Sequence, residues 1–357
     1  MERSSKQLRS ALPERVFAFI YKIAKITPVM VAGIALAACQ TTATQVREDS
    51  QRLEFVSYNP EGYDAIIGGN YQVKPATISG DLYLPAGDEK APVVVLMHGS
   101  GGVYGLLPLY RDIIQALDAR GIGAFVVDSY SGRGIGETAS QQSRLSIPGN
   151  VIDGFQALKL LAGHPRVDAD RIGISGTSRG GIVAFQTAHA GFAEKVGEGL
   201  SFAGHLPVYP SCQLRFEDAR FTDAPILMLL GEKDDYTPAH FCVDYAKELA
   251  ANQVEIETKV YPNAHHGFDG KRAPGTCSTC AVFADCGLAI VERDGNETAL
   301  DGKVSTRNGW KNFVSTLYKA CGRRGATVGL NSEARTDRIK TTADFFAKAL
   351  RPRKAGS

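Results

Sequence analysis

The sequence lacks three features that would each point to a particular class of protein. It has no apolar run suited to a membrane: the apolar stretch at 26–39 is too short for a comfortable transmembrane helix. It shows no internal repeat or low-complexity segment. It also lacks a charge excess, since residues 40–357 carry 34 basic and 36 acidic side chains. We therefore expect no nucleic-acid binding, which would need a concentrated basic face.

The first 39 residues have the features of a targeting segment. Basic residues precede the apolar stretch, and small residues precede Cys39 in LAAC. This tetrapeptide resembles a bacterial lipoprotein box, which implies cleavage before Cys39 and lipidation of its sulfur. We therefore expect the chain to be anchored to a bacterial membrane in the cell envelope, facing the periplasm or exterior. The alternatives are a simple signal peptide, an uncleaved anchor helix and a cytosolic tail.

Residues 71–350 are predicted to form one α/β domain. Apolar runs typical of buried strands alternate with segments whose apolar residues recur at helical spacing, as in 91–97 followed by 109–120. This alternation predicts a mostly parallel sheet with helices on both faces. Residues 71–85 predict a β-hairpin broken at Ser79-Gly80.

The remaining segments are assigned by the loss of that alternation. Residues 40–70 are predicted to be a tether and irregular lead-in, and 351–357 a tail. Gly, Cys and charged residues replace the alternation over about 269–329, which predicts an insertion in the domain. Within it, 309–320 is expected to form a helix that covers the site.

The stretch GTSRGG, 176–181, matches the G-x-S-x-G pattern. It follows a predicted strand and precedes a predicted helix, the context in which the pattern forms a nucleophile elbow. Gly176 and Gly180 would leave room where the tight turn brings backbone segments together. Ser178 is therefore a candidate nucleophile, although the motif alone would be a weak signal.

An acid and a histidine follow in suitable loops. Asp234 and Asp235 come directly after the predicted strand 224–231, and His265 and His266 come after the next one. In a parallel α/β sheet, loops at the carboxyl ends of strands lie at the ligand-binding edge. The order Ser, Asp, His is that of α/β-hydrolases.

A set of motifs resembles the dienelactone hydrolase family of α/β-hydrolases over residues 72–269. They are HGSGG, DSYSGRG, GTSRGG, YPSC, GEKDDYTPAHFC and YPNAHHGFD. The resemblance implies an α/β-hydrolase fold and resumes weakly in the last helix. The family's founding enzymes use a cysteine nucleophile, whereas this elbow carries Ser178. We therefore expect a serine hydrolase acting on an ester and do not carry over the lactone specificity.

The resemblance also guides the choice among the triad candidates. His266 precedes Gly-Phe as in the family's HxF pattern, so it is preferred as the base, with His265 as the fallback. Asp234 occupies the acid position of the family's GxxDxxxP pattern, so it is preferred to Asp235. Asp235 is then expected to cap the helix that begins near Pro238.

Three further roles are assigned around the triad. The backbone N–H groups of Ser100 and Arg179 are expected to form the oxyanion hole. Arg133 and Tyr104 are candidate substrate-binding residues, and the Arg179 side chain could also meet an anionic substrate. We expect no cofactor and no metal in the catalytic site.

Six cysteines follow Cys39, the even number that three disulfides need. Cys212 and Cys242 flank strands beside the acid loop and are expected to pair. The other four could form disulfides, hold zinc or provide a redox-active pair, and the expected oxidising compartment favours disulfides. These four are Cys277, Cys280, Cys286 and Cys321.

The sequence thus predicts an exported serine hydrolase that cleaves a small-molecule carboxylic ester or lactone through an acyl-enzyme. Three alternatives stay open at this point: a serine peptidase of prolyl-oligopeptidase type, a noncatalytic envelope binding protein on the same scaffold, and a thiol or zinc module. Neither a protein partner nor an oligomeric state can be named from the sequence.

Overall fold

Eight strands form the main sheet of the computed structural model, which describes residues 50–352. Their order is β1-β2-β4-β3-β5-β6-β8-β9, and every pair from β4 to β9 is parallel, whereas β2 is antiparallel to both of its neighbours. The strands are β1 (Gln51–Ser57), β2 (Ala76–Tyr83), β3 (Ala91–Met97), β4 (Gly123–Asp128), β5 (Val167–Thr177), β6 (His205–Val208), β8 (Ile226–Gly231) and β9 (Ile256–Tyr261).

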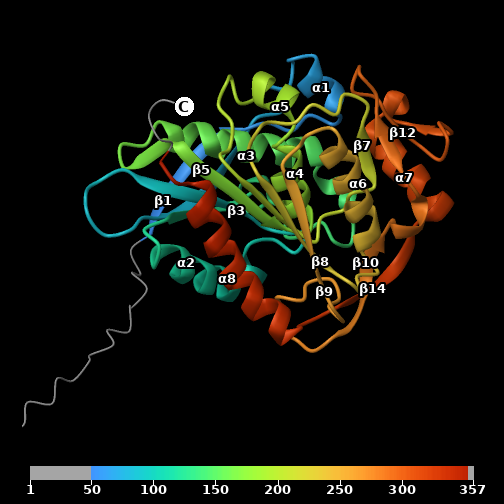
Figure 1. The fold of residues 1–357 in the computed structure, drawn as a ribbon. Coiled ribbons are helices and arrows are strands. Elements are labelled where there is room, and N and C mark those ends of the chain that lie inside the picture. Colours follow the sequence, from blue (N-terminus) through green and yellow to red (C-terminus); the bar gives the residue numbers. More distant parts are fainter. Residues whose placement is uncertain (1–49, 353–357) are drawn as a thin grey trace, which may run out of the picture. The chain divides into compact units, whose positions relative to one another are not determined.

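Helices cover both faces of this sheet (Figure 1). In β3, Val93 and Val95 face one core with α1, α3 and α5, whereas Val94 and Leu96 face the other with α2 and α8. A strand buried on both faces is apolar throughout, as this sequence predicts. The helices are α1 (Tyr63–Ile67), α2 (Leu107–Asp118), α3 (Ile147–Ala162), α4 (Arg179–Gln186), α5 (Ala190–Lys195), α6 (Ala239–Ala251) and α8 (Ser332–Ala349).

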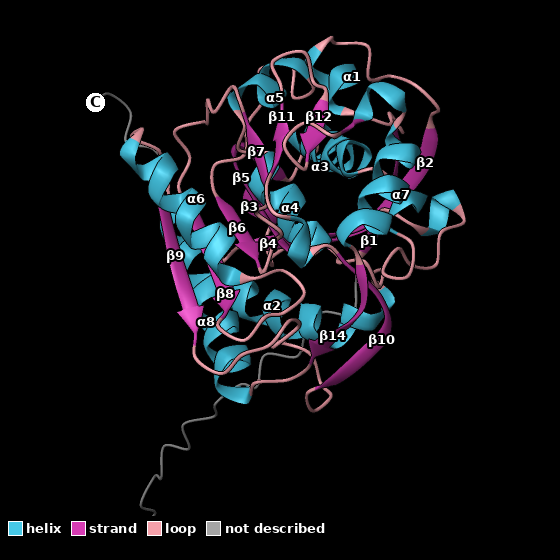
Figure 2. Cartoon of the chain, turned by 90° about the vertical axis from the view of Figure 1, so that its right-hand side faces the viewer, coloured by secondary structure: helices cyan, strands magenta, loops and turns pink. Residues whose placement is uncertain are grey.

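The predicted insertion contains strands that its composition does not reveal (Figure 2). One small sheet joins β13-β12-β11 to β7 of the core, and a second pairs β10 with β14. The predicted helix 309–320 is present as α7. The elements are β7 (Leu214–Phe216), β10 (Gly275–Val282), β11 (Ala289–Val291), β12 (Glu297–Ala299), β13 (Val304–Ser305), α7 (Trp310–Cys321) and β14 (Arg323–Val328).

Two predictions at the start of the domain are wrong. The lead-in predicted as irregular contains β1 and α1, so the main sheet begins at Gln51. The predicted hairpin at 71–85 is absent, because β2 runs straight through Ser79 and Gly80 and pairs there with β1 and β4. Since β1 is an edge strand with an exposed face, its sequence is largely polar and gives a weak strand signal.

All six cysteines of the described chain form disulfides. Cys212 pairs with Cys242, which confirms that prediction. The remaining pairs are Cys277–Cys280 and Cys286–Cys321, so these four cysteines form the predicted disulfides and not a zinc site. The Cys286–Cys321 bond ties the end of α7 to the segment between β10 and β11.

Two candidate features are absent from residues 50–352. None of their helices is long and apolar enough to cross a membrane. Nor does any group of three or more His, Cys, Asp or Glu side chains in this range form a candidate metal site. Cys39 lies outside the described residues.

Candidate active site

Ser178 occupies a sharp turn between β5 and α4. Its φ of 54° and ψ of −116° are rarely adopted by a residue with a side chain, and such strain is typical of functional turns. A Cβ at Gly176 would collide with the Gly180 carbonyl, and one at Gly180 would collide with the Met97 carbonyl. Both glycines are therefore required by close backbone approach, which is the structural basis of a nucleophile elbow.

The predicted triad residues form a hydrogen-bonded row. Ser178 Oγ lies 2.9 Å from His266 Nε2, and His266 Nδ1 lies 2.8 Å from Asp234 Oδ2. When Nδ1–H donates to the carboxylate, Nε2 is left as the acceptor for the Ser178 hydroxyl. The Asp234 side chain is fully buried, whereas Ser178 is half-buried and faces a pocket. This geometry lets the imidazole take a proton from the hydroxyl.

The Asp234 carboxylate is held in place by the turn that follows it. The backbone N–H groups of Tyr236 and Thr237 donate to Oδ1 at 2.9 and 2.8 Å. The Thr237 hydroxyl lies 3.0 Å from Oδ2. The His266 ring packs between the rings of Tyr209 and Tyr236, with centroids 4.7 Å away in each case. Thr237 was not singled out from the sequence, although it lies within the motif that carries the acid.

The fallback residues are engaged elsewhere. Asp235 accepts hydrogen bonds from the Thr327 backbone N–H at 2.7 Å and from its hydroxyl at 3.0 Å. Asp235 therefore anchors β14 to the acid loop, and the expectation that it caps α6 is wrong, because no side-chain cap is present at Pro238. His265 Nδ1 lies 3.0 Å from the Lys233 carbonyl oxygen. Neither side chain contacts Ser178.

The insertion also holds the histidine loop. Gly329, just after β14, donates its backbone N–H to the His266 carbonyl at 3.0 Å. The Asn331 backbone N–H likewise donates to the Phe268 carbonyl at 2.8 Å. Behind the loop, Asp269 forms an ion pair with Arg338 of α8, and both side chains are buried. The segment that joins the histidine loop to α8 therefore helps to hold the triad in place.

The two predicted oxyanion donors lie beside Ser178. Arg179 follows it directly, and a Cβ built on Gly99 would lie 3.3 Å from the Ser178 Cβ, so the loop carrying Ser100 adjoins the nucleophile. Over residues 50–352, neither the Ser100 nor the Arg179 backbone N–H has an intramolecular acceptor. Both are therefore free to meet a substrate oxygen, as an oxyanion hole requires.

His98 has a structural position beside that loop. It accepts a hydrogen bond from the Ser129 backbone N–H at Nε2, 3.2 Å away. Its Nδ1 therefore carries the proton and donates to the Gly99 carbonyl at 2.8 Å. Burial lowers the pKa of His98, which keeps the ring neutral and the loop fixed.

The structure does not bring Arg133 or Tyr104 to the pocket, so both substrate-binding predictions are wrong. The Arg133 guanidinium pairs with Asp153 of α3 at 2.7 Å, and the two side chains are 5% and 0% exposed. A buried carboxylate needs such a partner, and the sequence does not show that α3 lies behind this loop. Tyr104 is 70% exposed and is not among the residues that line the pocket.

The Arg179 side chain does reach the pocket, but three of its five N–H donors are bound to other residues of the protein. It is buried, and it donates from Nε to Asn150 Oδ1 at 2.7 Å and from Nη1 to Gln142 Oε1 at 3.1 Å. A third bond from Nη2 reaches the Leu145 carbonyl. These bonds indicate that the guanidinium organises the pocket wall.

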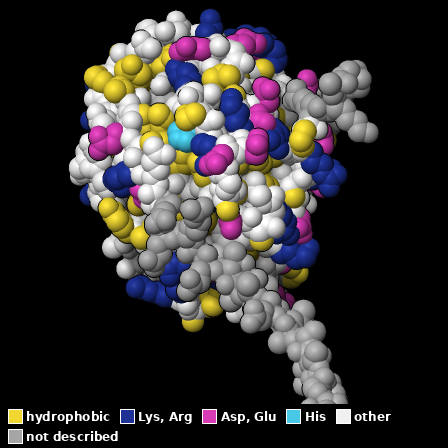
Figure 3. Space-filling view, turned by 90° about the vertical axis from the view of Figure 1, so that its left-hand side faces the viewer, with side chains coloured by type: hydrophobic (Ala, Val, Ile, Leu, Met, Phe, Trp, Pro, Cys, Tyr) yellow, Lys and Arg dark blue, Asp and Glu magenta, His cyan; other side chains and the backbone are white. Residues whose placement is uncertain are grey.

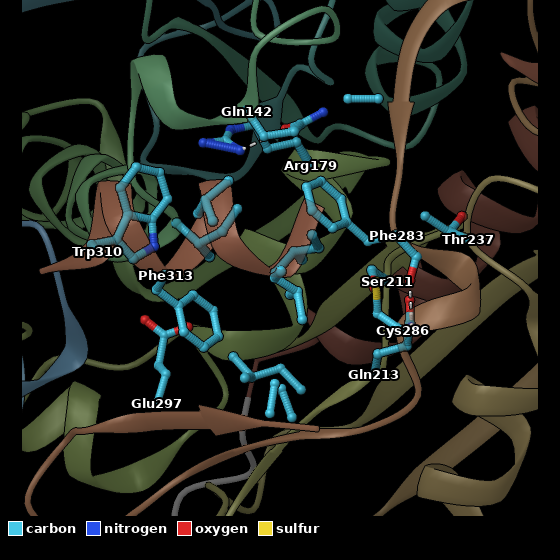
Figure 4. Close-up of a pocket in the computed structure, with 18 of the residues that line it drawn as sticks. Gln142, Arg179, Ser211, Gln213, Thr237, Phe283, Cys286, Glu297, Trp310 and Phe313 are labelled. Atoms are coloured by element: carbon cyan, nitrogen blue, oxygen red, sulfur yellow. Dashed lines mark hydrogen bonds between the residues drawn. The ribbon is translucent and has the colours of Figure 1, made fainter. Parts of the chain in front are cut away.

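A cavity of about 220 Å³ opens beside Ser178 (Figure 4). The core supplies Ser178, Arg179 and Ile182 to its walls, and the insertion supplies a mainly apolar wall opposite. That wall includes α7, so the expectation that this helix covers the site is confirmed. The insertion residues are Ala281, Phe283, Cys286, Gly287, Ala289, Glu297, Ala299, Trp310, Phe313, Val314 and Leu317.

Glu297 is the one carboxylate among the residues that line this cavity. Glu297 is 6% exposed, and its Oε1 has no hydrogen-bond partner among the described residues. Burial, with a smaller effect of the Asp64 charge, raises the pKa of Glu297 to about 8. The sequence gives no sign that Glu297 lies at the site, because β12 is only three residues long and has no strand signal.

The raised pKa of Glu297 makes stability depend on pH. The unfolded chain releases the Glu297 proton near pH 4.5, whereas the folded chain keeps it to about pH 8. The free energy of unfolding should therefore fall as pH rises through this window, by up to about 4 kcal/mol. Glu297→Gln should remove this fall and be more stable than wild type at pH 8.5. Urea unfolding at pH 5 and pH 8.5 would measure it.

The matched control is Glu257→Gln, which makes the same chemical change at an exposed position of β9. This variant should keep the pH dependence of the wild type. If wild type and Glu297→Gln instead showed parallel stability curves, Glu297 would not be a protonated buried acid.

The elbow, the row of three side chains and the sheet order define an α/β-hydrolase. Residues 78–294, more than half of the chain, match the model of the dienelactone hydrolase family. The chain therefore belongs to that family, and it is a hydrolase. The resemblance seen in the sequence motifs is thereby confirmed.

Individual relatives are distant. A putative carboxymethylenebutenolidase of Aquifex aeolicus is 29% identical over 186 residues, which cover 50% of this chain and 76% of that protein. A probable 2-oxo-3-(5-oxofuran-2-ylidene)propanoate lactonase of Bradyrhizobium is 26% identical over 201 residues, 52% of this chain and 77% of the relative. A probable dipeptidyl-aminopeptidase B of Paracoccidioides brasiliensis is 31% identical over 140 residues, but these cover 38% of this chain and only 14% of that protein.

Among solved structures, a putative dienelactone hydrolase from Klebsiella pneumoniae is similar at a TM-score of 0.48 and 17% identity. The similarity covers 84% of this chain and 99% of that one.

Proposed function

We propose that the protein is a serine hydrolase that cleaves a carboxylic ester or lactone through an acyl-enzyme on Ser178. The observation that carries the proposal is the row Ser178, His266, Asp234, with links of 2.9 and 2.8 Å. A serine hydroxyl is a poor nucleophile unless a base lies within hydrogen-bond reach, and here one does. Serine in place of the cysteine of the family's founding enzymes favours a general ester over their lactones.

The reaction then follows from the geometry. His266 Nε2 removes the hydroxyl proton as Ser178 Oγ attacks the ester carbonyl, and the new oxyanion is met by the Ser100 and Arg179 backbone N–H groups. Asp234 holds the ring and stabilises the imidazolium. His266 then gives the proton to the leaving alcohol, which departs and leaves the acyl-enzyme. A water molecule activated by His266 hydrolyses that ester and restores Ser178.

The alternatives receive less support. A noncatalytic binding protein would have no need of the 2.9 Å contact between Ser178 and His266 at the wall of a cavity. The peptidase alternative is motivated by the similarity to dipeptidyl-aminopeptidase B, which covers 14% of that protein. The relatives matched over three quarters of their length are described as a carboxymethylenebutenolidase and a lactonase, which favours ester chemistry.

We also propose export and anchoring through a lipid on Cys39. Three disulfides among the described residues support this location, because such bonds persist in oxidising compartments.

The face in Figure 3 carries basic and acidic side chains interspersed, without a single-sign patch that would favour a nucleic acid. The partner we propose is a small-molecule ester, which the cavity beside Ser178 could hold.

A substrate panel tests the ester proposal. Purified protein would be assayed with short-chain p-nitrophenyl esters, simple lactones and peptide p-nitroanilides, with Ser178→Ala as the background. We expect kcat/KM to be highest for esters, measurable for lactones and lowest for anilides. A preference for anilides would replace the esterase by the peptidase, and no turnover of any class would favour the binding protein.

A further inference from the structure

The mechanism makes no use of Glu297, which forms part of the pocket wall in the insertion. Figure 4 draws its carboxyl group directed toward Phe313 and Trp310, on the opposite side of the cavity from Thr237 of the acid loop. The group is buried, and its Oε1 lacks a partner within the described chain. A buried polar group without a partner is costly, so one aimed into a substrate pocket calls for a ligand group.

No described protein cation satisfies this carboxyl. Arg179 donates hydrogen bonds to Asn150, Gln142 and Leu145 and forms none with Glu297. Arg307, near β12 in the sequence, pairs with the half-buried Glu292 at 3.0 Å and the exposed Asp294 at 2.8 Å. The negative charge of Asp64 in α1 disfavours a second negative charge on Glu297 and so raises its pKa further. This end of the cavity is therefore acidic.

Aromatic rings surround the same end. Tyr63, Trp310 and Phe313 all line the cavity with Glu297, and the Tyr63 hydroxyl donates to Gln186 Oε1 at 2.7 Å. Aromatic faces attract cations, and a carboxylate forms its strongest hydrogen bonds with charged N–H donors. The combination of one unpaired carboxyl and several rings fits an organic ammonium better than a neutral polar group.

We propose that Glu297, with Trp310 and Phe313, binds a positively charged amino group of the substrate, so that the enzyme prefers esters whose chain ends in an ammonium group. This inference rests on the proposed function for the reaction at Ser178. The binding of the ammonium group itself does not depend on catalysis and can be measured separately.

Trp310 supplies a local probe, because it is the only tryptophan in the sequence and lines the cavity. Its fluorescence would be titrated with n-hexylammonium chloride and with 1-hexanol at pH 8.5. Burial raises the pKa of Glu297 to about 8, so the carboxyl is largely ionised at that pH, whereas an alkylamine stays protonated. We expect the wild type to bind the amine at least about tenfold more tightly than the alcohol.

Glu297→Gln keeps the shape of the side chain and removes its charge. This variant should bind n-hexylammonium about tenfold more weakly than wild type and bind 1-hexanol with unchanged affinity. Glu257→Gln on exposed β9 should behave as wild type, and thermal unfolding would confirm that each variant folds. Equal affinity for amine and alcohol in the wild type would overturn the proposal, as would an amine preference that survives in Glu297→Gln.

A pair of esters connects binding to turnover. The p-nitrophenyl ester of 6-aminohexanoic acid would be compared with that of heptanoic acid, which has a methyl group in place of the ammonium. A lower KM for the amino ester, lost in Glu297→Gln, supports the inference. Equal KM values without amine binding would overturn it and leave the ester hydrolase intact. Amine binding without hydrolysis of either ester would overturn the proposed function and retain the ammonium site.

Discussion

Ser178→Ala should lower kcat/KM for a p-nitrophenyl ester by about 10⁴- to 10⁶-fold, because the variant has no nucleophile for the acyl-enzyme. The substitution removes one oxygen from a half-buried side chain, so the fold should persist. The residual rate would come from the oxyanion donors and from substrate binding. Initial rates over a range of ester concentrations, corrected for spontaneous hydrolysis, would measure the loss.

The control for this variant is Ser332→Ala at the exposed start of α8, which should retain wild-type activity. Circular dichroism and thermal unfolding should show that both variants fold. If Ser178→Ala kept its kcat/KM within tenfold of wild type, the covalent mechanism would be wrong.

Asp234→Asn should lower kcat by about 10⁴-fold, because an amide in this position favours the wrong imidazole tautomer and cannot stabilise the imidazolium. The adjacent Asp235→Asn provides a close comparison, since the same chemical change occurs one residue along the chain. Asp235 binds Thr327 and not His266, so its variant should stay within about tenfold of wild type. Steady-state kinetics of both variants would distinguish the two acids.

The comparison depends on the loop keeping its shape. Thermal unfolding would show whether Asp235→Asn loosens the connection between β14 and the acid loop. A larger kinetic loss in Asp235→Asn than in Asp234→Asn would contradict the assignment of the triad acid.

The sequence predicted the central part of the fold because the physical signals there are strong. Strands buried on both faces, such as β3, must be apolar throughout, and helices between them show their period clearly. The elbow was predictable because close backbone approach requires glycine at 176 and 180. The triad loops follow from the rule that ligands meet the carboxyl ends of parallel strands.

The remaining features depend on contacts between segments that are distant in the sequence. Edge strand β1 and the short strands of the insertion carry too few apolar residues to give a strand signal. The ion pair of Arg133 cannot be predicted from the sequence, because its partner Asp153 lies on α3, which only folding brings behind the loop. In the sequence Glu297 resembles an ordinary surface acid, and its burial is evident only in the folded chain.

The most direct test of the acyl-enzyme account is mass spectrometry of the folded protein after reaction with a fluorophosphonate. We predict a mass increase of one phosphonyl group, located on the peptide that contains Ser178. The label should be absent from Ser178→Ala and from wild-type protein denatured before the reaction. No label on the folded wild type, or a label on another residue, would contradict the central claim that His266 and Asp234 activate Ser178.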